Sequence, residues 1–162
     1  MKTVAFTTLG CRVNQYDTDA MKGLFLQHDY EAVDFDSKAD IYVINTCSVT
    51  NMGEKKSRQL IRKAKRQNEK AYVIVTGCYA QLDPDAIAAI DGVNLVIGTN
   101  NRSKIVELVE QLESTERQIN AVRDIMNESN FEEMPLYGNE SDKARAFMKI
   151  QEGCNNYCAF CI

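Results

Sequence analysis

The sequence has a single histidine, no tryptophan and no long apolar run among its 162 residues. One histidine, His28, cannot supply a ligand to two separate zinc sites. No apolar stretch approaches the ~20 residues of a membrane-spanning helix, and the first fifteen residues lack a basic segment followed by an apolar one. A net charge of −4 argues against nucleic-acid binding through overall charge. We therefore expect a cytoplasmic protein without a membrane partner.

The sequence contains six cysteines. Thiols stay reduced in the cytoplasm, so we interpret them as metal ligands or redox groups rather than disulfides. The last three, Cys154, Cys158 and Cys161, have the spacing Cys-x-x-x-Cys-x-x-Cys. A structural zinc site normally takes four ligands, whereas an iron–sulfur cubane held by three thiolates keeps one iron open for a substrate. The terminal triplet therefore favours a cluster.

The first hundred or so residues alternate between short β-branched runs and helical periodicity. Strands are predicted at 3–9, 31–35, 41–46, 72–76 and 94–97, and helices at 14–27, 53–68, 85–90 and 101–113. Five strands in βα alternation predict an α/β fold with a five-stranded, parallel, doubly wound sheet. In the flavodoxin-like order 2-1-3-4-5, the first, third and fourth strands are neighbours.

The other three cysteines follow those three strands. Cys11, Cys47 and Cys78 each come just after a predicted strand end. Because the carboxyl ends of parallel strands share one edge, and neighbouring strands lie about 4.8 Å apart, we expect the thiols to converge. Any one alone is more often a small core residue, but three equivalent positions favour a shared site. Asn14 and Asn45 flank this site, although asparagine near a turn more often caps the backbone.

The pattern changes after residue 113. Residues 114–144 have the polar, acidic composition of a linker. A further strand is predicted at 146–150, feeding the terminal cysteine loop. We therefore divide the chain into a domain at 1–113, a linker at 114–144 and the truncated start of a second domain at 145–162.

A predicted helix at 53–68 carries seven basic residues against one acid, Glu54. One interpretation is a local phosphate-binding face. The other is an ordinary solvated outer helix, which most charge runs form.

Four segments, in order and at comparable spacing, resemble the radical S-adenosylmethionine methylthiotransferases. They are LGCRVN at 9–14, NTCSVTN at 45–51, TGCYAQ at 76–81 and KIQEGCNN at 149–156. The Cys-Arg-Val-Asn form and the KSRQ that follows at 56–59 resemble the branch acting on threonylcarbamoyl-adenosine in transfer RNA. The branches acting on isopentenyl-adenosine or on a ribosomal-protein aspartate remain alternatives.

The resemblance implies a transferase that replaces a carbon–hydrogen bond of an adenine ring next to the anticodon with a methylthio group. It implies two [4Fe-4S] clusters, an auxiliary one on Cys11, Cys47 and Cys78 and one on Cys154, Cys158 and Cys161 that cleaves S-adenosyl-L-methionine at the start of a radical SAM barrel. It also implies a tRNA substrate and an electron donor for the full-length protein. The oligomeric state stays unknown.

Phe160 precedes the last cysteine, where the superfamily places an aromatic near the cofactor's adenine; a core aromatic is the other interpretation. No catalytic side chain is expected, because the cofactors carry the chemistry. We expect this chain alone to be inactive, since cofactor and substrate must be held in register by the missing barrel. We also expect the terminal cysteines to be poorly ordered and to lose a cluster first.

Two alternative interpretations assign the chain to other functional classes. A flavodoxin-like electron carrier would hold a flavin phosphate in the loop at 7–10, but leaves six cysteines unexplained. A zinc-stabilised module lacks a fourth ligand for each triplet. The absorption spectrum of anaerobically purified protein separates iron–sulfur, flavin and colourless protein.

Overall fold

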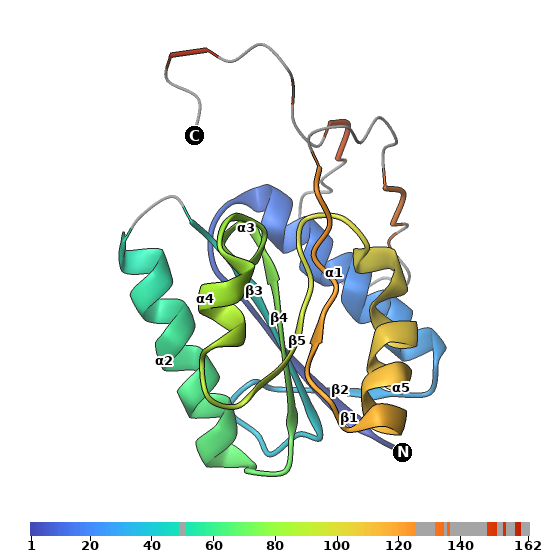
Figure 1. Ribbon diagram of the computed structural model, residues 1–162. Helices are drawn as coiled ribbons and strands as arrows, with labels where there is room; N and C mark the ends of the chain where they lie inside the picture. Colours follow the sequence, from blue (N-terminus) through green and yellow to red (C-terminus); the bar gives the residue numbers. More distant parts are fainter. Residues whose placement is uncertain are drawn as a thin grey trace.

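The computed structural model describes residues 1–48, 51–125, 132–134, 136, 149–151, 154 and 158–159, with only the backbone at 51–52 (Figure 1). A six-stranded parallel sheet has the order β2-β1-β3-β4-β5-β6. Its strands are β1 (Thr3–Thr8), β2 (Glu31–Val33), β3 (Ile41–Thr46), β4 (Tyr72–Gly77), β5 (Val93–Val96) and β6 (Ile119–Asn120). The helices are α1 (Arg12–Gln27), α2 (Asn51–Gln67), α3 (Cys78–Leu82), α4 (Pro84–Ala88), η1 (Arg102–Lys104) and α5 (Ile105–Thr115).

Helices cover both faces of the sheet (Figure 1). On one face, Phe25 of α1 and Val109 of α5 pack against strand residues such as Val43. On the other, Ile61 of α2 and Ile87 of α4 pack against the opposite side of the same strands. β3 is buried at every position, as expected for a central strand of a parallel sheet. The carboxyl ends of the central strands therefore open between two helical layers.

The predicted fold class and strand order are confirmed, with two additions. β6, at Ile119–Asn120, pairs with β5 and makes the sheet six-stranded rather than five-stranded. It lies inside the stretch predicted as a linker, because a strand of two residues leaves no periodicity to detect. The short helix α3, at Cys78–Leu82, was also missed. The predicted proline-initiated helix is α4, where Asp83 accepts a hydrogen bond from the Ala86 amide at 3.1 Å.

The second domain is not seen in the described part of the chain. Residues 149–151 form no strand, contrary to the prediction for 146–150, and residues 146–148 lie outside the described ranges. A strand that opens a sheet needs a neighbour with which to pair. Within the described ranges, no helix is both long and apolar enough to cross a membrane.

Candidate functional site

Three cysteines lie at the carboxyl edge of the sheet, on adjacent strands. β1 pairs with β3, and β3 pairs with β4. Cys11 is the residue directly before α1, Cys47 directly follows β3, and Cys78 begins α3 at the end of β4. The sequence-based expectation that the three loops meet at one edge agrees with this placement.

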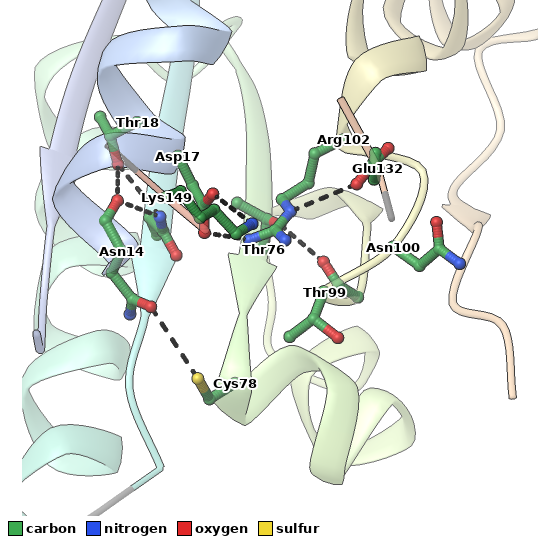
Figure 2. A network of polar contacts seen from close by, with 12 residues as sticks. Asn14, Asp17, Thr18, Thr76, Cys78, Thr99, Asn100, Arg102, Glu132 and Lys149 are labelled. Carbon is green, nitrogen blue, oxygen red and sulfur yellow. Dashed lines mark hydrogen bonds and ion pairs between the residues drawn. The ribbon is translucent and has the colours of Figure 1, made fainter. Parts of the chain in front are cut away.

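The side-chain amide of Asn14 stands between two of the thiols. Its Oδ1 lies 3.9 Å from the Sγ of Cys11. It also lies 3.9 Å from the Sγ of Cys78 (Figure 2). Its Nδ2 donates to the backbone oxygens of Leu9, at 2.8 Å, and Thr46, at 3.0 Å. Because both amide hydrogens point at carbonyls, the oxygen necessarily faces the thiols. One buried amide thus joins the loops after β1, β3 and β4.

Two glycines allow this close approach. Gly10 has φ +106°, and a Cβ there would lie 2.9 Å from Cys47 Cβ and 3.0 Å from its Sγ. Gly77 has φ +97°, and a Cβ there would lie 2.4 Å from the Thr46 carbonyl oxygen. Only glycine combines a positive φ with no side chain at such contacts. The geometry therefore explains why a glycine directly precedes Cys11 and Cys78.

A second layer of polar groups fixes Asn14. Asn45 donates from Nδ2 to the Asn14 backbone oxygen at 2.8 Å and to the Thr18 hydroxyl at 3.0 Å. Thr8 in turn donates to Thr18 at 2.8 Å. All of these bonds tie the start of α1 to the ends of β1 and β3. Among the described residues, Oδ1 of Asn45 is buried without a hydrogen-bond partner.

The electrostatics of the site oppose bare thiolates. Burial raises the pKa of Cys78, and the neighbouring sulfurs of Cys47 and Cys11 raise it further, while the Arg102 guanidinium partly offsets them. Three negative sulfurs this close repel one another unless a cation lies among them. A positively charged metal group is the partner that removes this repulsion.

These residues fit an iron–sulfur cluster by their chemistry. The donors are three soft thiols. No group of three or more His, Cys, Asp or Glu side chains in the described ranges is arranged to hold a single metal ion. Three thiolates are the donor set of a cubane cluster that keeps one iron open.

Two of the three terminal cysteines lie among the described residues. Cys154 and Cys158 are exposed, free thiols. Cys161 and Phe160 lie outside the described residues, so their predicted roles stay predictions.

Sequence reasoning undervalued Asn14. Its amide does bond backbone oxygens, as a capping interpretation expects, but it also faces two thiols. Its position in the sequence could have indicated this role. Asn14 follows Cys11 by three residues at the start of a predicted helix, and residues three apart on a helix are neighbours on its surface.

A basic cavity of about 1140 Å³ lies between α2 and α4. Its lining includes Leu9, beside the first cysteine loop, and six cations of α2: Lys56, Arg58, Arg62, Lys63, Lys65 and Arg66. Some have internal partners, since Arg58 donates to the Tyr79 hydroxyl at 3.1 Å and Lys63 pairs with Asp36. The predicted basic helix therefore forms one wall of a cavity that reaches the cysteine edge.

Known proteins similar to this chain are methylthiotransferases. The threonylcarbamoyladenosine tRNA methylthiotransferases MtaB of Bacillus subtilis and Aquifex aeolicus are 52% and 46% identical over 100% and 98% of the chain. The ribosomal protein uS12 methylthiotransferase RimO of Parasynechococcus marenigrum is 35% identical over 99% of it. The chain spans only 36%, 38% and 34% of these three relatives.

A solved structure titled "Structure of two RcsB dimers bound to two parallel DNAs." matches with a TM-score of 0.50 at 11% identity, over 74% of this chain and 63% of that one. At this identity the likeness shows the fold alone. A family model described as "Uncharacterized protein family UPF0004" matches residues 3–98, which include Cys11, Cys47 and Cys78. Because that match covers more than half of the chain, the chain belongs to the UPF0004 family.

Proposed function

We propose that this chain is the cluster-binding domain of a tRNA methylthiotransferase that acts on N6-threonylcarbamoyladenosine. The observation that carries the proposal is the meeting of the Cys11, Cys47 and Cys78 loops around Asn14. The relatives of highest identity given above support the tRNA branch, since both are named for that substrate. A cytoplasmic location and an external electron donor follow from this activity.

Each cysteine set has an assigned group in this proposal. Cys11, Cys47 and Cys78 hold an auxiliary [4Fe-4S] cluster, and Cys154, Cys158 and Cys161 hold a second one that binds S-adenosylmethionine, with Phe160 beside it. When bound, these cofactors supply the radical, the sulfur and the methyl group. The chain's own residues hold and orient them. Asn14 contacts all three loops, and the glycines let the loops approach.

We place an RNA contact in the basic cavity between α2 and α4. Phosphates need cations, and an RNA-modifying enzyme that carries a net charge of −4 in this part needs a local basic surface. Lys56, Arg62 and Arg66 are exposed there. Since Leu9 also lines the cavity, RNA bound along α2 extends toward the cysteine edge.

The electron-carrier alternative is disfavoured by the loop at residues 7–10. A phosphate nest needs unengaged backbone amides, but the Leu9 amide donates to the Asn45 oxygen at 2.8 Å. The Thr8 hydroxyl is likewise turned inward to Thr18.

The full-length protein tests the proposal. The protein is first reconstituted anaerobically with iron and sulfide, and then supplied with reductant and S-adenosylmethionine. It is incubated separately with tRNA carrying threonylcarbamoyladenosine, with tRNA carrying isopentenyladenosine, and with ribosomal protein uS12. Mass spectrometry should find the methylthio product with the first only. Product on either of the others alone overturns the branch, and no product on any overturns the activity. Cys78→Ala should abolish product, whereas Ser114→Ala, at an exposed position far from the edge, should not.

A further inference from the structure

Four charged side chains form a buried network next to the cysteine site (Figure 2). Asp17 of α1 pairs with Arg102 of η1 and also accepts from Lys149 Nζ at 2.9 Å. Arg102 Nε lies 3.7 Å from a carboxylate oxygen of Glu132. The side chains of Asp17, Arg102 and Lys149 are 1%, 2% and 2% exposed, and that of Glu132 is 9% exposed. Two positive and two negative groups are thus withdrawn from water together.

Stability alone does not explain such a network. Withdrawing four charges from water is costly, and well-packed apolar residues often stabilise a protein as much or more. The better-attested role of buried ionic groups is to fix one arrangement of segments over others, because a charge left unpaired is heavily penalised. Here the network joins segments 85 and 132 residues apart in the chain.

The contact between Asp17 and Lys149 joins the segment that begins at Cys11 to the segment that leads to Cys154. Asp17 lies six residues after Cys11 and one turn after Asn14 on α1, about 9 Å along the helix from Cys11. Lys149 lies five residues before Cys154, a stretch that spans at most ~18 Å when extended. The contact between Asp17 and Lys149 therefore limits how far the terminal cysteines can stand from the first site.

The linker is fastened at the same place. Glu132 accepts hydrogen bonds from the Ser103 amide at 2.9 Å and the Ser103 hydroxyl at 2.8 Å, beside Arg102. Met134 is buried in the core, and the Tyr16 hydroxyl of α1 donates to its backbone oxygen at 3.3 Å. The chain is thus held at Glu132 and Met134 before it reaches Lys149.

We propose that the Asp17–Arg102–Lys149 network is a positioning device that holds the segment bearing the second cysteine set in register with the site formed by Cys11, Cys47 and Cys78. The inference rests on the proposed function, in which both sites must serve one substrate atom. Lys149 is the positioning residue on the second segment, and Asp17 is its counterpart on the first. Arg102 pairs with the Asp17 carboxylate and orients it, so that it can receive Lys149.

The first test measures the fastening itself in the full-length protein. Hydrogen exchange is followed in peptides covering 132–136 and 149–151. Lys149→Met removes the charge and keeps most of the length, so exchange should rise at least tenfold at 149–151 and stay unchanged at 132–136. Arg102→Met should raise both. Lys70→Met, at an exposed position on the opposite edge of the sheet, is the matched control and should change neither. Unchanged exchange at 149–151 in Lys149→Met overturns the proposal.

The second test separates positioning from general destabilisation. With iron content and melting temperature matched to the parent, Lys149→Met should still cleave S-adenosylmethionine to deoxyadenosine, but the ratio of methylthio product to deoxyadenosine should fall at least tenfold. Lys149→Arg, which keeps the charge, should recover most of the ratio. A merely structural role lowers both products together and leaves the ratio unchanged, which contradicts the proposal. If the parent itself makes no methylthio product, the proposed function fails, while the exchange measurement still decides the fastening.

Discussion

The Oδ1 atom of Asn14 lies 3.9 Å from the Sγ atom of Cys78, although the two residues are 64 positions apart in the chain. The contact exists because α1 starts directly after β1, so that its first turn overhangs the edge where β4 ends. The same amide donates to Leu9 and Thr46. The relative placement of three loops therefore depends on one side chain.

We expect Asn14→Ala to destabilise the fold and loosen the cysteine site. The substitution removes the donors to two backbone oxygens, and a buried acceptor left unpaired costs about 1–3 kcal/mol. Urea unfolding should show a loss in that range, and the variant should retain less iron than the parent. Gln15→Ala, on the same helix, removes a partly buried bond to Asp19 and leaves no backbone oxygen unpaired, so it should cost less, at most about 1 kcal/mol. An Asn14 variant as stable as that control contradicts the role of the amide.

Alanine at Gly77 should disrupt the site more than alanine at another positive-φ glycine. A Cβ at Gly77 meets the Thr46 backbone oxygen at 2.4 Å, so the strand end itself must move. Gly92 has a similar φ of +91°, but a Cβ there meets only the flexible Lys65 side chain. Both variants should lose about 1–3 kcal/mol from backbone strain, measured by thermal or urea unfolding. Only Gly77→Ala should also lose iron and sulfide. Equal iron in the two variants argues against a cluster held by the loops that carry Cys11, Cys47 and Cys78.

The sheet was predictable because its signals are local. β3 was predicted at its observed bounds, since a continuous β-branched run flanked by polar residues admits few other structures. The placement of Cys11, Cys47 and Cys78 followed, because parallel strands share an edge by topology. β6 was not predictable from two residues, which acquire strand geometry only by pairing with β5.

The polar networks were not predictable for a different reason. Asp17, Arg102 and Lys149 look like ordinary charged residues in the sequence, and most such residues are solvated. Their burial depends on how α1, η1 and the segment at 149–151 meet in space. The role of Asn14 likewise depends on a contact with a loop 64 residues away. The sequence shows the chemistry of each residue, but it does not show which distant residues become its partners in the fold.

Hydrogen bonds to Asp40 at the start of β1 should make the free energy of unfolding depend slightly on pH. The Thr3 amide and hydroxyl both donate to Asp40 at 2.9 Å, and the amide bond in particular lowers the pKa of this carboxyl. A lowered pKa stabilises the fold at pH values above the ordinary one near 4, and that contribution disappears as the pH falls through the lower folded value. Asp40→Ala should therefore lose at most about 1 kcal/mol at pH 7, because the carboxylate is exposed. The difference from the parent should shrink between pH 4 and pH 2; a difference that grows in acid contradicts the assignment.

Reversing charges in the basic cavity should weaken RNA binding by the full-length protein. Lys56, Arg62 and Arg66 changed together to Glu should lower the affinity for tRNA by at least about tenfold near physiological salt, and should flatten the salt dependence of binding. Lys38→Glu with Lys70→Glu provides like-signed changes at exposed positions away from the cavity. Filter binding or fluorescence anisotropy over a salt series measures both quantities. An equal loss per reversed charge in the two sets of variants indicates that only net charge matters and that the cavity is not the contact.

The two cysteine sets should differ in how durably they hold iron in this chain. Cys11, Cys47 and Cys78 are presented by complete strand ends and a fixed amide, whereas Cys154 and Cys158 are exposed thiols with no such frame among the described residues. Cys11 is exposed as well, so the expected difference comes from the frame around the first set, which limits how far its ligands can move away from a cluster. After anaerobic reconstitution and brief exposure to air, Ala at Cys11, Cys47 and Cys78 should remove most of the remaining iron and sulfide, while Ala at Cys154, Cys158 and Cys161 should remove little. Circular dichroism verifies that each triple variant is folded, so that lost iron reports ligation rather than unfolding. If the first variant keeps as much iron as the parent and the second loses it, the auxiliary cluster does not reside on the edge formed by β1, β3 and β4.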